Sequence, residues 1–474
     1  MKFYVTTPIY YVNDKPHIGH AYTTIAADVL ARYHRLKGDE VFFLTGTDEN
    51  AQKNVQAAEK LNKDTQTYVD EMSFLWQKTW NDLGLSHDDF IRTTEERHLV
   101  AVKKFWEAVQ AKGDIYEGEY EGWYCVGCES FKTESDLVNE ECPSHKKKPE
   151  WLKEKNYFFR LTNYRDQLLA HIDAHPDFIQ PVARRNEVRS YVEKFMTDVS
   201  ISRSSLKWGI QVPGDEDQRI YVWFDALINY LTAVGYGVDE VMFKKFWPAD
   251  LHLVGKDIIK FHCALWPAML FSAGVALPHH VFAHGFFTID GEKMSKTIGN
   301  VIDPIAVAQN FGADVLRYFL FREITFGEDG DFSIARLEQR YDGELASELG
   351  NLVQRVLIMA QKYGVASAPK IELSIDGWTK DYTSAMNEFR LHDGLQEAGR
   401  IVREANQLID KQAPWKLAKD GKREELEQVL NELLTMIHAV ACMLEPFMPT
   451  TSERIFSQLK IMTAEPLFPR RNVI

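Results

Sequence analysis

The first fifty residues contain a strand, a helix and a second strand in immediate succession. Residues 3–12 (FYVTTPIYYV) are rich in β-branched and aromatic side chains, which favour a strand. Residues 17–38 (HIGHAYTTIAADVLARYHRLKG) have the spacing of an amphipathic helix, and residues 41–50 (VFFLTGTDEN) indicate another buried strand. A strand, a helix and a strand in this order form a parallel pair, since the crossover returns the chain in the same direction. The sequence therefore predicts an α/β fold with a parallel sheet.

The pattern changes further along the chain. From about residue 115 to residue 203 the chain is rich in Cys, Lys, Trp and Tyr and has short strand-like runs, which is typical of an insertion. Strand and helix patterns resume in residues 221–231, 250–266 and 279–290. Residues 344–456 are helical almost throughout, with apolar side chains three and four apart. The sequence predicts an α/β domain split by an insertion and followed by a helical domain.

Composition limits the classes of function. A chain of 474 residues is too long for one compact core. The formal charge of −14 argues against a general nucleic-acid coat, because phosphate binding depends on lysine and arginine. The opening residues lack a signal-peptide pattern, and the longest apolar run, Cys263 to Pro278, is broken by Pro267 and too short to span a bilayer. We expect a cytoplasmic protein that reaches any nucleic acid through local basic patches.

The segment Pro16–His20 (PHIGH) lies between the first predicted strand and helix. The start of a helix offers unpaired N–H groups and a positive dipole, which suit phosphate. His17 and His20 lie on one side of the first turn, and Gly19 leaves the backbone open to a ligand. Taken alone, two histidines near a helix start are more often structural.

A second cationic segment, Asp290–Asn300 (DGEKMSKTIGN), lies far downstream between two apolar stretches. Its Lys293 and Lys296 have the chemistry to close on a triphosphate and to stabilise the charge that develops as pyrophosphate leaves. A lysine-rich loop by itself is usually a solvated turn. Both segments flank α/β elements, and their co-occurrence favours an ATP site.

These residues resemble the class I aminoacyl-tRNA synthetases, and among them the methionyl-tRNA synthetases, along the whole chain. The family's HIGH motif stands as His17 to His20, and its KMSKS motif as Lys293, Met294, Ser295 and Lys296 followed by Thr297 in place of the last serine. The resemblance implies a Rossmann-type catalytic domain split by a zinc-binding insertion, then a stem-contact segment and an α-helical anticodon-binding domain. The predicted boundaries are 1–116, 117–205, 206–285, 286–345 and 346–474.

The resemblance also implies a reaction. The methionine carboxylate attacks the α-phosphate of ATP, which carries Mg²⁺, and the methionyl group then passes to the terminal adenosine of tRNA(Met). Orientation and charge stabilisation suffice, without a covalent nucleophile. The implied catalytic residues are His17, His20, Lys293 and Lys296. The implied ATP-binding residues are these four with Gly19, Gly255, Asp257, Met294 and Ser295.

A methionine site needs an apolar, aromatic pocket for the thioether and a carboxylate for the ammonium group. By position, the family's methionine-binding set is matched by Ile9, Tyr11, Asp48, Trp223, Ala226, Tyr230 and His284, with Asp48 taking the ammonium. Each aromatic residue alone is more often a core residue. Where relatives usually continue TGTDEHG, this chain has Asn50 and Ala51.

The insertion carries a metal-binding pattern. Cys125 and Cys128 form CxxC, and Cys142 and His145 form CxxH. Two such pairs supply the four ligands of a closed tetrahedral zinc site, which stabilises a small insertion. The alternative is four unligated side chains in a reducing cytosol. Cys263 and Cys442 lie in apolar helical stretches and are expected in the core.

The helical domain is expected to read RNA. Asn351 and Arg355 are four residues apart, so they share a helix face, and Trp415 follows a proline at a predicted helix start. An exposed tryptophan can stack on an unpaired base. These three residues match the family's anticodon-reading positions, although such residues in isolation are more often a solvated pair and a core tryptophan.

Three other readings were weighed against this one. A leucyl or cysteinyl synthetase is disfavoured by the pocket residues, by the small insertion and by a zinc site with no open position. A non-catalytic zinc-containing RNA-binding protein would not need both histidines and both lysines. Small nucleotidyltransferases share the histidine turn but lack a helical domain of this size. By analogy we expect a monomer without membrane contact.

Overall fold

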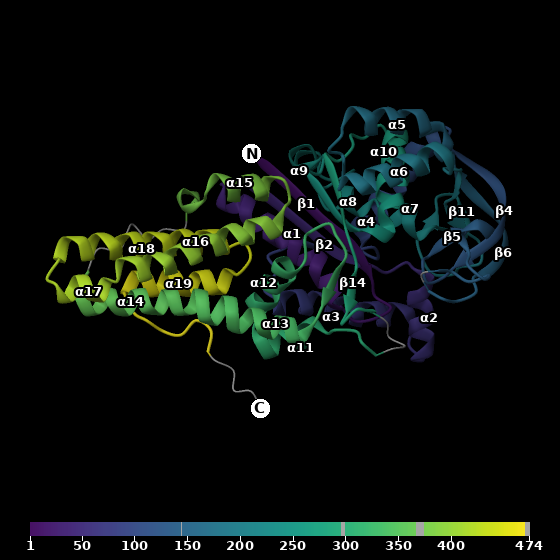
Figure 1. The fold of residues 1–474 in the computed structure, drawn as a ribbon. Coiled ribbons are helices and arrows are strands. Elements are labelled where there is room, and N and C mark those ends of the chain that lie inside the picture. Colours follow the sequence, from purple (N-terminus) through teal and green to yellow (C-terminus); the bar gives the residue numbers. More distant parts are fainter. Residues whose placement is uncertain (144, 295–298, 366–373, 470–474) are drawn as a thin grey trace. The chain divides into compact units, whose positions relative to one another are not determined.

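The computed structural model describes residues 1–143, 145–294, 299–365 and 374–469. The chain divides into two compact units (Figure 1). The first, here called the sheet unit, comprises residues 2–16 and 41–284. The second, here called the helix unit, comprises Met1, residues 17–40 and residues 285–474.

The centre of the sheet unit is a six-stranded sheet with the order β3-β2-β1-β12-β13-β7. Its strands are β1 (Lys2–Tyr11), β2 (Glu40–Asp48), β3 (Asp89–Arg92), β7 (Ile179–Gln180), β12 (Leu251–Gly255) and β13 (His280–His284). β1 pairs with β12, β12 with β13, β13 with β7 and β2 with β3, all in parallel. The predicted parallel sheet is confirmed. Since the chain continues from β1 to β2 on one side while β12 lies on the other, the strand order reverses at β1, which is where α/β sheets bind ligands.

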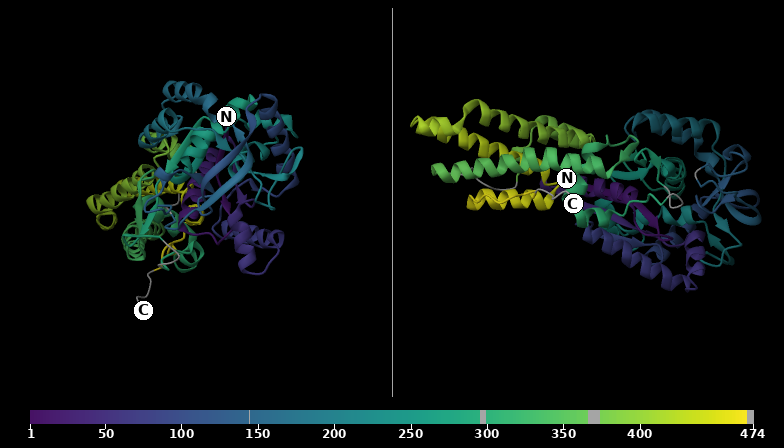
Figure 2. Two further views of the ribbon diagram at one scale, coloured as in Figure 1. Left: turned by 90° about the vertical axis from the view of Figure 1, so that its right-hand side faces the viewer. Right: turned by 60° about the horizontal axis from the view of Figure 1, so that its bottom comes forward.

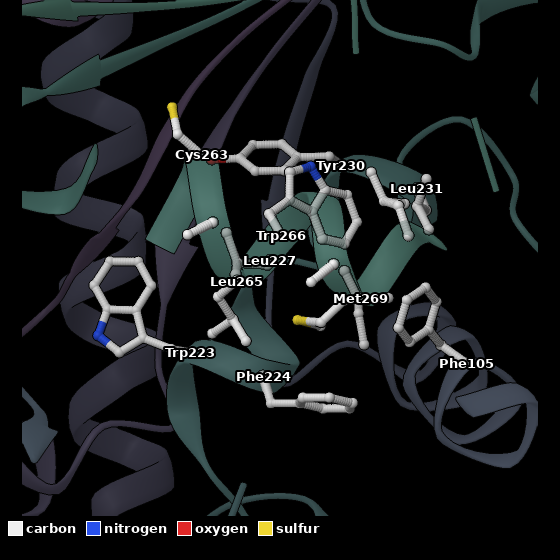
Figure 3. Close-up of a cluster of buried hydrophobic side chains, with 14 of the residues drawn as sticks. Phe105, Trp223, Phe224, Leu227, Tyr230, Leu231, Cys263, Leu265, Trp266 and Met269 are labelled. Atoms are coloured by element: carbon white, nitrogen blue, oxygen red, sulfur yellow. The ribbon is translucent and has the colours of Figure 1, made fainter. Parts of the chain in front are cut away.

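Apolar helices pack on this sheet. α3 (Thr65–Asp82), α4 (Glu96–Ala111) and α10 (Trp266–Ala273) contribute fully buried tryptophans to the interior. Figure 3 shows Phe105 of α4 and Trp266 at the head of α10 within one apolar cluster, which also holds Tyr230. The run from Cys263 to Pro278 is largely buried and helical as far as Ala273, as expected: it begins with the last residues of a π-helical turn, η4 (Phe261–Leu265), and continues as α10, which ends before Gly274. Within the described parts of the chain, no helix has the length and apolar character needed to span a membrane.

The predicted insertion forms a separate antiparallel sheet with the order β5-β4-β6-β8. β4 (Ile115–Cys125) pairs with β6 (Glu150–Phe159) from Ile115 opposite Phe159 to Tyr124 opposite Glu150. These strands are longer than the short runs that the sequence indicated. Their exposed faces carry charged pairs such as Lys153 with Glu121, so the apolar alternation that identifies a strand is weak.

The remaining elements of the sheet unit are short. They are α2 (Gln52–Lys60), β5 (Ser130–Lys132), η1 (Glu134–Asp136), η2 (Leu161–Tyr164), α5 (Arg165–Ala174), α6 (Val182–Lys194), β8 (Val199–Ser200), β9 (Ser202–Arg203), β10 (Gln211–Val212), β11 (Asp215–Ile220), α7 (Val222–Ala226), α8 (Asn229–Thr232), α9 (Glu240–Phe246) and η3 (Lys256–Ile258). The stretch 221–231, whose pattern indicated alternating elements, contains α7 and all of α8 but its last residue, and these helices place its aromatic side chains in the interior.

The helix unit begins with α1 (Ile18–Leu36) and is helical over most of its length. Its helices are α11 (Pro304–Phe311), α12 (Ala313–Glu323), α13 (Ile334–Arg340), the π-helical η5 (Tyr341–Gly350), α14 (Asn351–Tyr363), η6 (Ile375–Gly377), α15 (Lys380–Asn387), α16 (Leu391–Gln412), α17 (Pro414–Lys419), α18 (Arg423–Leu444) and α19 (Pro449–Ile461). A small sheet joins β15 (Glu292–Lys293), β14 (Phe287–Ile289) and β16 (Gly330–Phe332). Figure 2 shows α14, α16, α18 and α19 running alongside one another, as expected for a helical domain.

A buried ion pair connects distant parts of the helix unit. Arg317 of α12 donates to Asp28 of α1 at 2.6 Å, and both side chains are at most 1% exposed. The same guanidinium donates to the carbonyl oxygens of Pro446 and Phe447. Asp28 also pairs with Arg32 at 2.8 Å, so its charge would stay paired without Arg317, whereas removing Asp28 would leave the buried Arg317 guanidinium without this carboxylate.

Candidate active site and metal site

Four of the predicted ligand-binding residues lie at the carboxyl ends of adjacent parallel strands in the sheet unit. Tyr11 ends β1, Asp48 ends β2, Gly255 ends β12 and His284 ends β13. Gly255 lies directly opposite His284 in the strand register. These ends surround the point where the strand order reverses, so the topology alone brings them to one edge of the sheet.

Asp257 adjoins this edge in η3, directly after β12. A Cβ atom on Gly255 would lie 2.6 Å from Asp257 Oδ1, closer than real Cβ contacts. The glycine therefore leaves room for the Asp257 carboxylate to lie against the strand end. Asp257 is exposed as a whole residue, so its side chain can be reached by a ligand.

Tyr11 and Trp223 form the aromatic part of the same region. Their rings meet edge to face with centroids 6.3 Å apart, and Trp223 stacks on Phe261 at 4.0 Å. Ala226 lies one turn after Trp223 on α7 and is 3% exposed. Ile9, two residues before the end of β1, is partly buried and packs against the same apolar cluster. In Figure 3, Trp223 lies to one side of the labelled cluster.

Tyr230 is fixed by a hydrogen-bond chain that sequence reasoning missed. His262 Nδ1 lies 3.1 Å from the carbonyl oxygen of Ile258, which can only accept, so Nδ1 carries the proton. Nε2 then accepts from the Tyr230 hydroxyl at 2.8 Å. Burial lowers the pKa of His262 to about 4, so the ring is neutral at pH 7. The sequence signal was weak, since His262 stands in an apolar helical run and Phe261 beside it has the pattern of a core residue.

Asp48 is buried, with 2% of its surface exposed, and no described residue supplies a hydrogen bond to its Oδ1 atom. Burial, together with Glu129, raises the pKa of the Asp48 carboxyl well above its usual range, while Lys53 opposes the shift. The Tyr11 hydroxyl and the Trp223 indole N–H likewise have no partner among the described residues. Buried polar atoms in folded proteins are nearly always paired, so a group of unpaired ones beside aromatic rings indicates a place for a polar ligand.

Asn50, where the family pattern has histidine, forms hydrogen bonds next to the predicted methionine pocket. Its amide donates to Asp225 Oδ2 at 3.0 Å and to the Thr93 carbonyl oxygen at 3.4 Å. Asp225 lies on α7 between Trp223 and Ala226 and is fully buried. Asn50 therefore donates a hydrogen bond to the helix that carries two of the predicted pocket residues.

The histidine motif forms a compact turn at the start of α1 in the helix unit. Gly19 N–H donates to His17 Nδ1 at 3.1 Å, and His17 N–H donates to His20 Nδ1 at 3.2 Å. The two rings stack with centroids 3.6 Å apart. Because each Nδ1 accepts, a neutral ring carries its proton on Nε2, and an Nε2–H group is a suitable donor to a phosphate oxygen.

The chain around the lysine motif lies next to this turn in the same unit. Ile18 N–H donates to the Ile302 carbonyl oxygen at 3.0 Å. A Cβ atom on Gly19 would lie 3.7 Å from the terminal methyl of Met294. The two motifs that the sequence associated are therefore neighbours. Ser295, Lys296 and Thr297 lie outside the described residues, and only the backbone of Lys293 is described, as part of β15.

The four predicted metal ligands come together in the sheet unit. One ligand atom from each of Cys125, Cys128, Cys142 and His145 lies within 4.8 Å of all the others. Cys128 Sγ is 3.3 Å from His145 Nδ1 and 3.5 Å from Cys142 Sγ, and all five cysteines of the chain are free of disulfides. Three thiols and an imidazole form a donor set that fits tetrahedral zinc and leaves no position open. Cys263 and Cys442 are buried core residues, as predicted.

The three predicted RNA-reading residues lie in the helix unit. Asn351 and Arg355 both belong to α14, with Asn351 exposed and Arg355 half-buried. Arg355 lies 3.8 Å from Asp410 near the end of α16, which is followed directly by α17 with Trp415. Trp415 is 44% exposed, which is unusual for its size and excludes the core reading.

Comparisons with known proteins agree with this geometry. Residues 3–149 and 132–357 match the family model for tRNA synthetases class I (M), and residues 361–472 match the anticodon binding domain of methionyl tRNA ligase. The chain is 46% identical to the methionine–tRNA ligase of Thermotoga maritima over 97% of its own length and 75% of the relative's. It is 45% identical to the methionine–tRNA ligase of Rickettsia conorii over 98% of its length and 94% of the relative's.

Solved structures of one protein give the same result. A structure of Mycobacterium tuberculosis methionyl-tRNA synthetase in complex with methionyl-adenylate matches with a TM-score of 0.91 and 39% identity, covering 99% of this chain and all of the other. Its apo form matches with a TM-score of 0.85 and 38% identity. Both likenesses extend over the catalytic and helical parts of the chain, since they cover nearly its whole length.

Proposed function

Because this chain belongs to the class I aminoacyl-tRNA synthetase family, in its methionyl group, we propose that it activates L-methionine with ATP and charges tRNA(Met). It is a methionine–tRNA ligase: methionyl-adenylate forms as pyrophosphate leaves, and the acyl group then passes to the terminal adenosine. The observation that carries the assignment of its substrate site is the set of unpaired buried polar atoms, Asp48 Oδ1 above all, beside the rings of Tyr11 and Trp223.

The methionine side chain is held by apolar and aromatic groups. Ile9, Tyr11, Trp223, Ala226, Tyr230 and His284 line the site, and the thioether gains from contact with the rings. The Asp48 carboxylate takes the ammonium group. An ammonium ion beside a buried carboxylate favours its charged form, so methionine binding should lower the raised pKa of the Asp48 carboxyl.

ATP enters as its magnesium complex. The Nε2–H groups of His17 and His20 and the helix start at Gly19 bind its phosphates, and Gly255 and Asp257 receive the adenosine, with Asp257 accepting from a ribose hydroxyl. Lys293, Met294, Ser295 and Lys296 close on the departing pyrophosphate, and the two lysines offset its charge. Catalysis then rests on alignment of the methionine carboxylate with the α-phosphate.

The metal held by Cys125, Cys128, Cys142 and His145 is structural zinc. Bound there, it would link the end of β4 to the loop that carries Cys142. With four protein ligands it has no position for a substrate thiol, which opposes the cysteinyl reading.

The helical domain selects the tRNA. Asn351 and Arg355 contact base edges, and Trp415 stacks on an unpaired anticodon base. The domain boundaries are 1–116, 117–205, 206–285, 286–345 and 346–474, with these three residues in the last. We place the protein in the cytoplasm as a monomer.

The decisive experiment is ATP–pyrophosphate exchange across the twenty amino acids, with zinc content measured on the same preparation. Exchange with methionine alone establishes substrate and chemistry together. Exchange with a different amino acid overturns the pocket assignment, and none from a folded, zinc-loaded sample overturns the activity.

A substitution tests the lysine motif separately. Lys296→Ala should slow adenylate formation by orders of magnitude, because the charge on pyrophosphate is no longer offset, and leave methionine binding nearly unchanged. Equal loss of binding would indicate a folding defect instead of a catalytic role.

A further inference from the structure

Lys53 connects the metal site to the predicted methionine pocket. It lies in the first turn of α2, five residues after Asp48. Its ammonium donates to the Gly127 carbonyl oxygen at 2.9 Å and lies 3.5 Å from the centre of the Tyr11 ring. Its backbone N–H donates to Glu129 Oε1 at 2.8 Å. A single residue thus contacts the chain on both sides of the metal ligand Cys128 and also a ring of the pocket.

The metal side of this connection is closely packed. A Cβ atom on Gly127 would lie 2.6 Å from the His145 ring, so the Gly127 backbone lies directly against a metal ligand. Glu129 is 1% exposed, and its carboxylate also accepts from the Tyr124 hydroxyl at 2.5 Å. The Tyr221 hydroxyl donates to the Glu129 carbonyl oxygen at 2.6 Å. The position of the Gly127 carbonyl therefore depends on how well ordered the chain around Cys128 is, here called the metal loop (residues 126–129).

The pocket side has fewer restraints. The Tyr11 hydroxyl has no partner among the described residues, and its ring meets Trp223 only by an edge contact. A cation over the ring face is attracted by the ring's quadrupole, and the attraction is larger where water is excluded. Lys53 therefore supplies the one polar contact described for the Tyr11 ring face.

We propose that Lys53 is a positioning residue: it holds the Tyr11 ring in its methionine-binding orientation and makes that orientation depend on the metal loop. The inference rests on the proposed function, in which Tyr11 contacts methionine. Lys53 itself need not touch the substrate. When the metal loop is ordered by zinc, the Gly127 carbonyl fixes the Lys53 ammonium, and the ammonium in turn fixes the Tyr11 ring.

The first test compares two substitutions in α2. Lys53→Met keeps the length of the side chain but removes the charge, and Lys60→Met makes the same change at an exposed position of the same helix. In pyrophosphate exchange, Lys53→Met should raise the KM for methionine about tenfold and change kcat about twofold or less, in line with a desolvated cation–π contact. Lys60→Met should match the wild type, and Lys53→Arg should recover most of the loss.

A double substitution identifies the route. If Lys53 acts through the ring, Lys53→Met should add almost nothing to the KM defect of Tyr11→Leu, because the ring it positions is absent. Additive effects on KM would overturn the proposal.

The dependence on the metal is measured by methionine binding, without turnover. Equilibrium dialysis with labelled methionine should show weaker binding after zinc removal in the wild type and a much smaller change in Lys53→Met. An equal change in both proteins would show that the metal acts by another route. Unchanged methionine affinity in zinc-replete Lys53→Met would also overturn the inference. So would a loss of affinity that is fully accounted for by a lower zinc content or a smaller folded fraction. If Lys53→Met does not fold, Lys53→Gln is judged by the same measurements. Failure of the proposed function is distinct, since the wild type itself would then show no methionine-dependent exchange.

Discussion

The predicted methionine pocket and the predicted anticodon-reading helices use polar side chains in opposite ways. At the edge of the sheet, Asp48 is buried and a hydrogen-bonded His262 holds Tyr230 in place. In the helix unit, Asn351 and Trp415 are exposed. A protein binds a small amino acid by surrounding it and excluding water, whereas it binds a folded RNA through side chains exposed on its surface. Substitutions in the pocket should therefore affect chemistry and folding together, and substitutions on the helices should affect RNA affinity alone.

The largest effect is expected at Asp48. Asp48→Asn keeps the shape of the side chain and removes the charge that holds the ammonium group. We expect kcat/KM for methionine in pyrophosphate exchange to fall about a thousandfold, the cost of leaving a buried charge unpaired. An unchanged KM for methionine would show that the ammonium binds elsewhere.

The second largest effect is expected from loss of the metal. Cys142→Ser should abolish stoichiometric zinc and lower the free energy of unfolding by about 3 kcal/mol at free zinc a hundredfold above the dissociation constant. The measurement is denaturant unfolding with zinc content determined in parallel. Cys263→Ser, at a buried cysteine away from the cluster, is the control and should retain zinc. Full stability of zinc-free Cys142→Ser would contradict a structural role.

The exposed region is tested at Trp415. Trp415→Ala should lower kcat/KM for tRNA charging about thirtyfold, because one base loses its stacking partner, and leave pyrophosphate exchange unchanged. Ile375→Ala, at an exposed apolar position of η6, should charge tRNA normally. If exchange and charging fell equally, the contrast between the two regions would fail.

The smallest effect concerns pH. Burial lowers the pKa of His262 from 6.5 to about 4, so the unfolded chain binds a proton there that the folded chain does not. Stability from this group is complete above pH 6.5 and is lost as pH falls toward 4. His262→Gln, which keeps a group able to accept from Tyr230, should remove about 1 kcal/mol of the stability difference between pH 7 and pH 5.5. Unfolding curves at both values, with identical pH dependence in the two proteins, would contradict this.

The sequence predicted the parallel sheet, the buried helix after Cys263 and the long helices, because each has a strong apolar period. It also brought the four metal ligands together correctly, since CxxC and CxxH spacings carry a chemical requirement of their own. The residue roles in the pocket came from family resemblance and stay predictions.

Contacts that depend on tertiary packing were not visible in the sequence. Neither Lys53 nor His262 stands in a distinctive local pattern. The contacts of Lys53 with Tyr11 and Gly127, and of His262 with Tyr230, join elements distant in the chain. Asn50 looked like a departure from the family pattern, yet the fold shows it bonded to Asp225. The π-helical turns were missed because their period differs little from that of an ordinary helix.

The hydrogen bond from Ile18 to Ile302 joins the two predicted phosphate-binding motifs through backbone atoms only. Substitution of either side chain leaves both the donor and the acceptor in place, with proline at position 18 as the exception, since it has no N–H. This hydrogen bond therefore places no requirement on either side chain, and the fully buried Ile18 side chain is restricted by packing instead. A change in the number of residues between the lysine motif and position 302 would shift the carbonyl out of reach. For this contact, evolution must preserve the number of residues between the lysine motif and position 302, more than the identity of the two side chains.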